Sequence, residues 1–232
     1  MLFLAIGSFF YASPAAAHAP RLLDNDGSVT IIEQPDVSQA FYGDLKNGPA
    51  FFSLKVDKPM DLYVSILVPN VAGIKKDKSV QIKYDNQGKD EIFWTLDGKN
   101  FAWRPWYERF GGDNYFQGPE IKKMAQPGEY FLAVYSGPDY VGKYVLVVGE
   151  KESFTLTDIV NTIFTLPTLK RDFFEKSPWL AYFNLTGVFM AIGILVLVIV
   201  YLIISSILKK VLAKKIEPEK LIRPSDDLHY RQ

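Results

Sequence analysis

The chain of 232 residues contains no cysteine and two histidines. Without cysteine it can form no disulfide, and it offers no thiolate as a nucleophile or metal ligand. The histidines are His18 and His229, and the topology predicted below places a membrane between them. A Ser-His-Asp triad is therefore excluded for any serine outside the membrane. The sequence also lacks a P-loop and a dinucleotide-binding fingerprint, so we expect no enzymatic activity and no cofactor.

The formal net charge is zero, with 26 basic and 26 acidic residues. From 18 to 176 there are 19 Lys and Arg against 22 Asp and Glu. From 209 to 232 there are 7 Lys and Arg against 4 Asp and Glu. Neither region forms the basic stripe that nucleic-acid binding needs, so we expect no nucleic-acid partner.

Two apolar segments predict where the protein resides. Residues 1–17 combine an apolar run with Ala15-Ala16-Ala17 and match a secretory signal peptide. Residues 177–208 carry no charge and exceed the roughly 20 residues that cross a bilayer. Basic residues follow at once in Lys209–Lys215, which predicts that this end is cytoplasmic. We therefore expect a single-pass protein of the cell membrane, with its N-terminal domain extracytoplasmic and its C-terminal tail cytoplasmic.

The region between these segments has the pattern of an all-β domain. Short runs rich in β-branched and aromatic residues alternate with turns containing Gly, Pro, Asn and Asp, which is typical of an antiparallel β-sandwich. We predict strands at 28–34, 38–45, 50–57, 60–69, 79–84, 91–96, 128–136 and 142–150. The fold class is thus all-β, a jelly-roll-like antiparallel β-sandwich followed by a juxtamembrane amphipathic helix and one transmembrane α-helix. The expected divisions are 1–17 signal peptide, 18–152 sandwich, 153–178 amphipathic juxtamembrane segment, 179–208 transmembrane helix and 209–232 cytoplasmic tail.

Two pairs of strands resemble a known family. Tyr42-Gly43-Asp44-Leu45 leads into Phe51–Val56, and Gly128-Glu129-Tyr130 through Val134 precedes a closing strand from Gly142-Lys143-Tyr144 to Val148. This arrangement resembles the bacterial pre-peptidase C-terminal (PPC) β-sandwich and the related GOLD-like lumenal domains, over about Ser38–Glu150. The whole chain resembles single-pass bacterial membrane proteins with such an ectodomain. The resemblance implies a binding, targeting or spacer module and supplies no activity.

The juxtamembrane segment has apolar residues at helical spacing. Ser153 or Thr155 could cap a helix whose first turn contains Asp158, and Pro167 is expected to interrupt it. An amphipathic segment directly before a span is typical of one that lies in the membrane interface. Packing against the sandwich and docking of a partner helix are the alternatives.

The chain departs from the family pattern between Trp94 and Gln126, a region that contains the stretch from Trp103 to Glu120. Its aromatic residues show neither strand alternation nor helical period, which predicts an irregular crossover. Its rings could form a satellite core that plugs one end of the sandwich, or some could stay exposed and bind a partner. Trp, Tyr and Arg dominate binding hot spots. The candidate binding residues are Trp94, Trp103, Arg104, Trp106, Tyr107, Glu108, Arg109 and Tyr115.

No metal ligand set stands out in the sequence. His18 would become the mature N-terminus after cleavage at Ala17, where its amine and imidazole suit copper, but no second outer histidine exists to complete a site. Scattered aspartates, Asp113 among them, could bind calcium, but their spacing follows no known loop.

We therefore expect a non-enzymatic interaction or accessory protein anchored in the membrane. Its partners would be the lipid bilayer and another membrane or envelope protein. The alternative is a membrane-tethered module that binds a glycan or metal ion through the aromatic loop 94–120. The sequence does not identify a small-molecule ligand.

Overall fold

The computed structural model describes residues 19–23, 27–46, 48–86, 88–137, 141–153 and 155–216. The expected signal peptide, His18 and the tail from 217 onward lie outside the described residues. The chain divides into one unit that extends to Gly187 and a second that begins at Val188. We describe each unit by itself.

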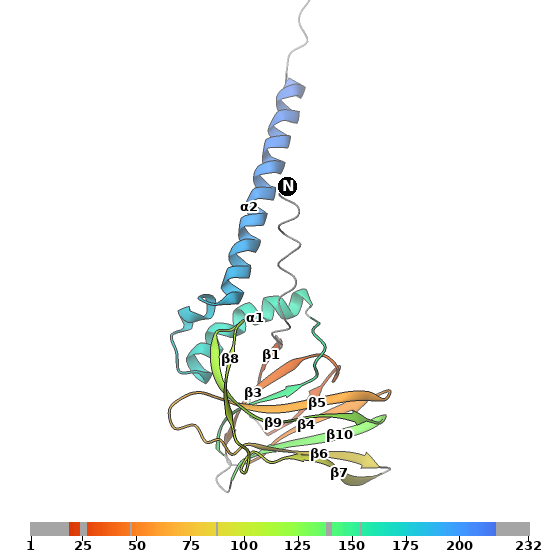
Figure 1. Cartoon of the computed structure of the whole chain (residues 1–232). Helices are drawn as coiled ribbons and strands as arrows, with labels where there is room; N and C mark the ends of the chain where they lie inside the picture. The colour runs from red at the N-terminus through yellow and green to blue at the C-terminus, as the bar shows by residue number, and fades with distance from the viewer. Residues whose placement is uncertain are drawn as a thin grey trace, which may run out of the picture. The chain divides into compact units, whose positions relative to one another are not determined.

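The first unit is built on two stacked β-sheets, which confirms the predicted sandwich (Figure 1). The six-stranded sheet has the order β1 (Ala19–Leu22), β3 (Gln39–Lys46), β11 (Val141–Val148), β5 (Met60–Pro69), β9 (Asp113–Ala125), β8 (Arg104–Glu108). The five-stranded sheet has the order β2 (Val29–Ile32), β4 (Ala50–Val56), β10 (Gly128–Tyr135), β6 (Ser79–Asn86), β7 (Lys89–Leu96).

Most neighbouring strands are antiparallel, as expected, but the two N-terminal edge strands are not. β1 pairs with β3 and β2 pairs with β4 in parallel. The sequence prediction also missed β1, β8 and β9. Strand β1 has four residues, too few to show a period. Strands β8 and β9 contain the aromatic stretch that the sequence predicted as an irregular crossover.

The main core lies between the sheets and follows the alternation of the central strands. Every second residue of β4 is buried, from Phe52 to Val56, as is every second residue of β5 from Leu62 to Val68. Successive side chains of a strand point to opposite faces, so these rows meet across the two layers. The alternation in 50–57 and 60–69 therefore predicted the core correctly.

One contact explains two residues of the family-like motifs. Gly43 in β3 is the register partner of Tyr144 in β11, and the Tyr144 ring is fully buried. A Cβ placed on Gly43 would lie 2.5 Å from Cζ and Oη of Tyr144. Gly43 is therefore needed to make room for a neighbouring ring, not to supply an unusual backbone angle.

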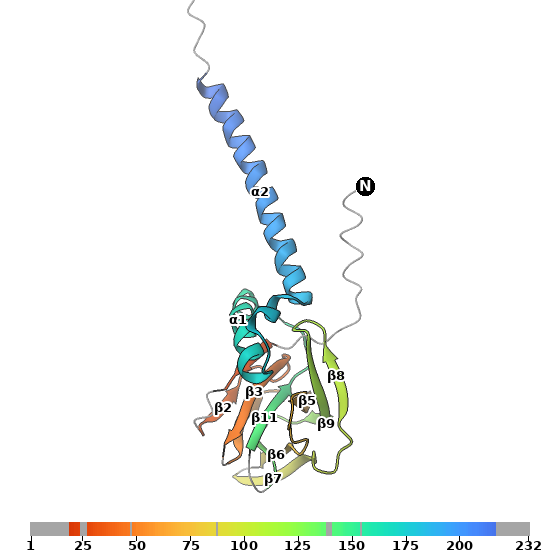
Figure 2. The same cartoon turned by 90° about the vertical axis from the view of Figure 1, so that its left-hand side faces the viewer.

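A second core lies on the outer face of the six-stranded sheet. It is formed by the residues that follow the sandwich, which we name the pre-span segment (residues 155–184). This segment contains α1 (Leu156–Thr168), the π-helical turn η2 (Leu169–Phe173) and the 3₁₀ turn η3 (Pro178–Tyr182). It lies against the β3–β11 side of the sandwich (Figure 2), where Leu169, Phe173 and Phe174 are buried together with sheet residues that include Ala40 and Val145.

Helix α1 begins as predicted but does not break at Pro167. The α-helix continues to Thr168 and passes into η2. Proline has no N–H to donate to the carbonyl four residues earlier, which here belongs to Ile163. The Tyr182 hydroxyl from η3 donates to that carbonyl at 3.2 Å. The proline therefore leaves an acceptor free inside the helix, and a tertiary contact satisfies it.

The start of α1 is tied to the sandwich through Asp158. Thr155 and Asp158 form a capping box, and Arg21 of β1 donates to Asp158 Oδ1 at 2.9 Å. The hydrogen bond from the Thr155 hydroxyl and, secondarily, the backbone of Thr155 and the charge of Arg21 hold the pKa of Asp158 below its ordinary value. The ionised carboxylate thus stabilises the attachment of α1.

The second unit consists of the long helix α2, whose bounds Leu185–Ile216 also include the last residues of the first unit. Among the described residues it is the helix long and apolar enough to cross a membrane, over the 28 residues Leu185–Leu212. The α-helix begins at Leu185, six residues after the predicted start at Trp179, because η3 occupies Pro178–Tyr182 and buries Ala181.

Gly43→Ala should destabilise the full-length protein by about 1–3 kcal/mol, since the added Cβ overlaps a buried ring that cannot move without strain. Denaturant unfolding of the detergent-solubilised protein, followed by fluorescence, measures the loss. Gly48→Ala is the matched control, because a Cβ there meets nothing within 4 Å. Equal losses for the two variants would contradict the packing argument.

Asp158→Asn should lower the Tm at pH 7 by removing the carboxylate that Arg21 and Thr155 stabilise. A depressed pKa adds stability above the ordinary aspartate pKa of about 4, and this stability is lost as the pH falls through the lower folded-state value. The Tm difference between wild type and variant should therefore shrink between about pH 5 and pH 3. Asp57→Asn, on an exposed turn, should leave the Tm at pH 7 unchanged. A pH-independent difference for Asp158→Asn would refute this account.

Candidate functional site at the aromatic hairpin

The aromatic stretch is a β-hairpin rather than an irregular crossover, which corrects the sequence prediction. Strands β8 and β9 are antiparallel, with Trp106 opposite Tyr115 and Glu108 opposite Asp113. We name residues 103–118 the aromatic hairpin. The pre-span segment covers part of its outer face. Glu108 is half-buried and Asp113 is buried, whereas Tyr107 is exposed, so burial does not follow the usual apolar–polar alternation.

Glu108 shapes the turn of the hairpin. Its carboxylate accepts hydrogen bonds from the backbone N–H groups of Phe110 at 2.6 Å and Gly111 at 2.5 Å. Gly112 has a φ of +70°, which glycine adopts without strain. Burial raises the pKa of Glu108 above its ordinary value, against the opposing effect of these two hydrogen bonds. Glu108 therefore has a structural role in holding the turn.

Trp103 anchors the hairpin to the main core. Its Nε1 donates to the carbonyl of Gly98 at 2.7 Å, and its ring packs over Gly118. A Cβ on Gly118 would lie 2.6 Å from the ring. The indole thus has a partner for its N–H and close contact on its face, as a buried tryptophan requires.

Trp106 and Tyr115 belong to the second core. The Tyr115 ring lies 5.6 Å from Trp106 and 5.2 Å from Phe174 of the pre-span segment. Its hydroxyl is 2.8 Å from that of Tyr42 in β3. Burial raises the pKa of both tyrosines well above the ordinary value, so both hydroxyls remain protonated at neutral pH. The buried Tyr115 ring therefore contacts the pre-span segment, and the half-buried Trp106 packs beside it.

A buried charge cluster lies beneath the turn. Asp113 Oδ2 is 2.6 Å from Nζ of Lys170 in η2, and only 2–3% of either side chain is exposed. Lys176 Nζ lies 3.0 Å from Asp113 Oδ1. Lys170 also donates to the carbonyl of Gly111 at 2.5 Å. The buried ions are paired and hydrogen-bonded, which is the condition for tolerating them away from water.

The turn also binds the residues where α2 begins. The carbonyl of Phe110 accepts from Thr186 N at 3.2 Å and from its hydroxyl at 2.9 Å. The carbonyl of Gly111 accepts from the Asn184 side chain at 2.7 Å. The backbone of one loop thereby fixes the end of the pre-span segment and the first turn of the helix.

The predicted binding residues separate into three groups. Trp103, Trp106, Glu108 and Tyr115 are structural, whereas Arg104, Tyr107 and Arg109 are exposed on the hairpin. Trp94 is not part of the hairpin and lies on β7 in the other sheet, beneath Lys123. The sequence analysis did not identify Lys170, Lys176 and Asn184 as site residues. A lysine among the apolar residues of an amphipathic segment was the feature that could have indicated a buried charge.

The described residues contain no group of three His, Cys, Asp or Glu side chains that could hold a metal ion. Asp113, one of the aspartates considered for calcium, is engaged by two lysines. The predicted His18 site lies outside the described residues.

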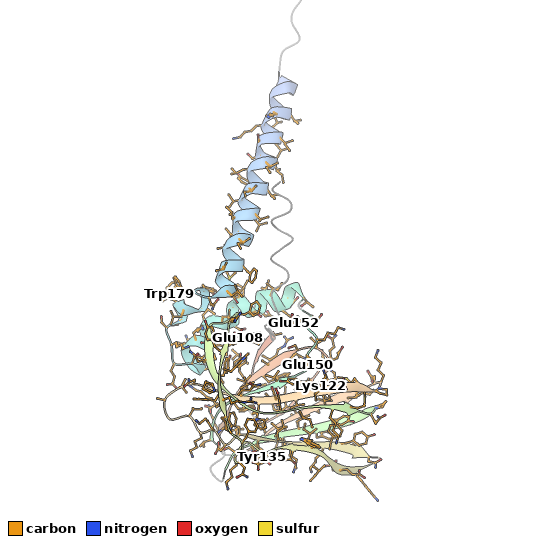
Figure 3. The ribbon with its side chains drawn as sticks, viewed as in Figure 1. Glu108, Lys122, Tyr135, Glu150, Glu152 and Trp179 are labelled. Carbon is orange, nitrogen blue, oxygen red and sulfur yellow. The ribbon has the colours of Figure 1, made fainter. Side chains whose placement is uncertain are left out.

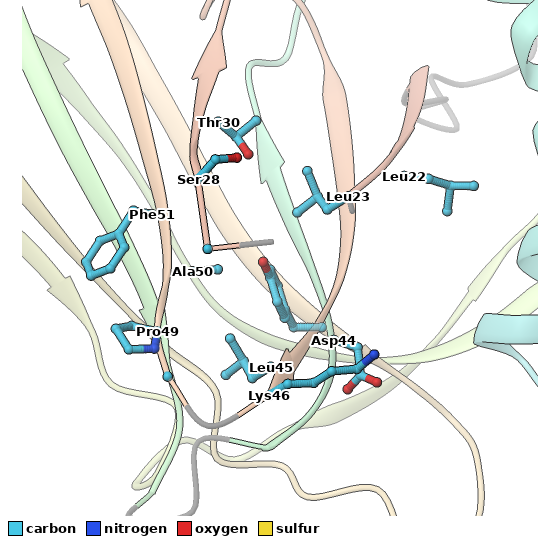
Figure 4. A pocket seen from close by; sticks show the side chains of 13 residues that line it. Leu22, Leu23, Ser28, Thr30, Asp44, Leu45, Lys46, Pro49, Ala50 and Phe51 are labelled. Carbon is cyan, nitrogen blue, oxygen red and sulfur yellow. The ribbon is translucent and has the colours of Figure 1, made fainter. Parts of the chain in front are cut away.

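A pocket of about 440 Å³ lies away from the hairpin, between β2 and the β3–β4 turn (Figure 4). Its walls carry polar groups from Ser28, Thr30, Asp44 and Lys46 as well as the ring of Phe51. Tyr144 also lines it, and no described residue hydrogen-bonds its buried hydroxyl. The pocket therefore has the mixed polar and aromatic lining of a small-ligand site.

Comparison with known proteins yields only distant structural likeness. No family model and no curated protein matches the chain. The pre-peptidase C-terminal domain of collagenase from Bacillus anthracis is 16% identical, with 55% of this chain and 98% of that chain covered and a TM-score of 0.33. A mitogen from Yersinia pseudotuberculosis is 8% identical, with 52% and 92% covered and a TM-score of 0.34. CorA, a surface-associated copper-binding protein of Methylomicrobium album BG8, is 10% identical, with 53% and 98% covered and a TM-score of 0.30.

Asp113→Asn should destabilise the full-length protein by about 3–5 kcal/mol, because it leaves the Lys170 ammonium buried without its counter-charge. Urea unfolding in detergent, followed by tryptophan fluorescence, measures the loss. The exposed pair Arg171–Asp172 provides the control, and Asp172→Asn should have a much smaller effect, because water screens an exposed ion pair. Adding Lys170→Met to Asp113→Asn should restore part of the stability. Equal effects of Asp113→Asn and Asp172→Asn would be incompatible with a structural role for the cluster.

Proposed function

We propose that this protein is a non-enzymatic, membrane-anchored interaction or accessory protein with a PPC-like ectodomain. The sandwich would lie outside the cytoplasmic membrane, with α2 as the span and residues 209–232 inside. The predicted signal peptide and the basic residues after the span support this orientation. The partner would be the extracytoplasmic part of another membrane or envelope protein.

The observation that carries the proposal is an apolar patch on the outer face of the five-stranded sheet. Val29 opposes Phe51, and Ile31 opposes Ser53, which in turn opposes Phe131. These cross-strand pairs make the patch continuous over β2, β4 and β10. Its large apolar members, Val29, Ile31, Phe51 and Phe131, are all exposed.

Such a patch favours a protein partner. Single exposed apolar residues are common on protein surfaces, but contiguous ones mark interaction sites. On the opposite sheet the pre-span segment buries part of the corresponding face, at Ala40, Leu67 and Val145, whereas the apolar patch of the five-stranded sheet is exposed. A flat sheet face suits a protein surface better than a small molecule, which binds in concave sites.

Ligand binding is the second candidate function, and the pocket lined by Tyr144 favours it. A polar atom of a ligand could pair with the Tyr144 hydroxyl, and Phe51 could pack on the ring of a sugar. This location differs from the aromatic loop, where Trp103, Trp106 and Tyr115 are already engaged.

Replacing both Ile31 and Phe131 with serine should abolish capture of a stoichiometric partner by the full-length protein from detergent-solubilised membranes of its source. A photoreactive residue at position 31 should cross-link to the same partner. Met124→Ser is the matched control, because Met124 is exposed on the other sheet.

Recovery of the wild-type protein alone would contradict this proposal, as would an equal loss with Met124→Ser. A cross-link between two copies of the chain would make self-association the interaction. A Tm that rises with added sugars in a protein without a partner would favour the pocket instead.

A further inference from the structure

The pre-span segment has two apolar faces, and the sandwich covers only one of them. Leu169, Phe173 and Phe174 are buried in the second core. Large apolar side chains on the other side remain in the open: Phe164 is 75% exposed, Trp179 76% and Phe183 82%. We name these three residues, with Val160, the pre-span aromatic face. Figure 3 places Trp179 towards the same end of the unit as Glu108 of the hairpin, and Tyr135 towards the other end.

We propose that the pre-span aromatic face inserts into the boundary between headgroups and acyl chains of the bilayer that α2 crosses. The sandwich would then rest on the membrane surface instead of standing away from it on a flexible stalk. This inference rests on the proposed membrane anchoring and adds a second lipid contact to it.

Chain connectivity limits how far these residues can be from the bilayer. An extended chain spans at most about 3.6 Å per residue, so Phe183 lies within about 7 Å of Leu185, the first residue of α2. Residues 177–208 contain no charge that would favour withdrawal into water. At 1.5 Å per residue, the 24 uncharged residues from Leu185 to Leu208 cover about 36 Å, somewhat more than the roughly 30 Å of the hydrocarbon core. Phe183 therefore lies at headgroup level, and Trp179, six residues before Leu185, lies within about 22 Å of that residue.

A tertiary contact ties the part of α1 that carries Phe164 to η3, although Phe164 precedes Leu185 by 21 residues. The Tyr182 hydroxyl of η3 is bonded to the carbonyl of Ile163, directly before Phe164. Since η3 is thereby fixed to α1, the exposed side of α1 cannot move away from the start of α2 without breaking this contact. The pre-span aromatic face is thus part of a packed structure, so its insertion into the bilayer would not require the segment to lose further conformational entropy.

The hairpin turn adds polar groups beside the same point. A Cβ on Gly112 would lie 3.5 Å from the Tyr107 hydroxyl and 3.0 Å from Asn184, so Tyr107 lies close to the beginning of α2. Tyr107 is 54% exposed, and Arg109 is exposed at the turn. Tyrosine and tryptophan are enriched at membrane interfaces, and arginine can bind lipid phosphate. This combination of rings and a cation matches a lipid surface.

The natural absence of cysteine permits a direct test with single-cysteine variants of the full-length protein. Nitroxide labels at Phe164→Cys, Leu197→Cys in α2 and Ile92→Cys on β7 would be compared after reconstitution into vesicles of phosphatidylcholine and phosphatidylglycerol. Phe164 and Ile92 are matched because both are apolar and exposed, at 75% and 65%. Collision rates with oxygen, which concentrates in lipid, and with a water-soluble nickel complex report the surroundings of each label.

We expect oxygen to be favoured severalfold over nickel at positions 164 and 197, and nickel to be favoured at position 92. A label at 164 that behaves like the one at 92, while 197 remains in lipid, would overturn the inference and leave the membrane anchor intact. An aqueous signal at 197 would overturn the anchor and the inference together. Preference for lipid at both 164 and 92 would show non-specific adsorption and would also reject the inference.

Discussion

The arrangement of the first unit depends on a buried carboxylate that engages two lysines from outside the sandwich. Asp113 lies at the start of β9, and its partners Lys170 and Lys176 come from the pre-span segment. Removing either side of a buried ion pair leaves an unpaired charge, whereas the complete pair is tolerated. The interaction therefore specifies where the segment docks, and the ring contacts of Tyr115 and Phe174 around it supply the apolar burial.

Once docked, the segment divides the surface of the domain into faces with different roles. Part of one outer sheet face is covered, while the apolar patch around Ile31 is exposed on the other sheet. The uncovered side of the segment exposes Phe164, Trp179 and Phe183. The proposed functions follow from this division: lipid against the pre-span aromatic face, and a protein partner against the sheet patch. The aromatic hairpin, which the sequence predicted as a candidate binding loop, holds the pre-span segment in place on the sandwich.

Predictions from the sequence were correct where the interactions involved are local in the chain, and failed where they join distant residues. Alternation in β4 and β5, a helix cap at Ser153 or Thr155 and the presence of a helix long and apolar enough to cross a membrane are local patterns, and each was predicted. The hairpin was missed because the polar Asp113 is buried against distant lysines while Tyr107 is exposed, so the apolar–polar alternation of a strand is absent. The prediction that Pro167 interrupts the helix was wrong for a related reason. The proline leaves the carbonyl of Ile163 without its helical donor, and the hydroxyl of Tyr182, 15 residues after the proline, donates to it.

The sequence by itself determined the fold class, the apolar rows of the core and the presence of one segment able to span a membrane. These properties are encoded in composition and in periods of two or 3.6 residues, which need no knowledge of distant partners. Only the tertiary structure decided that Trp106 and Tyr115 are structural, that Lys170 is buried, and that the helix begins at Leu185 beside the hairpin turn. Those outcomes depend on contacts between groups that lie 57 to 76 positions apart in the chain, and no local pattern specifies such contacts.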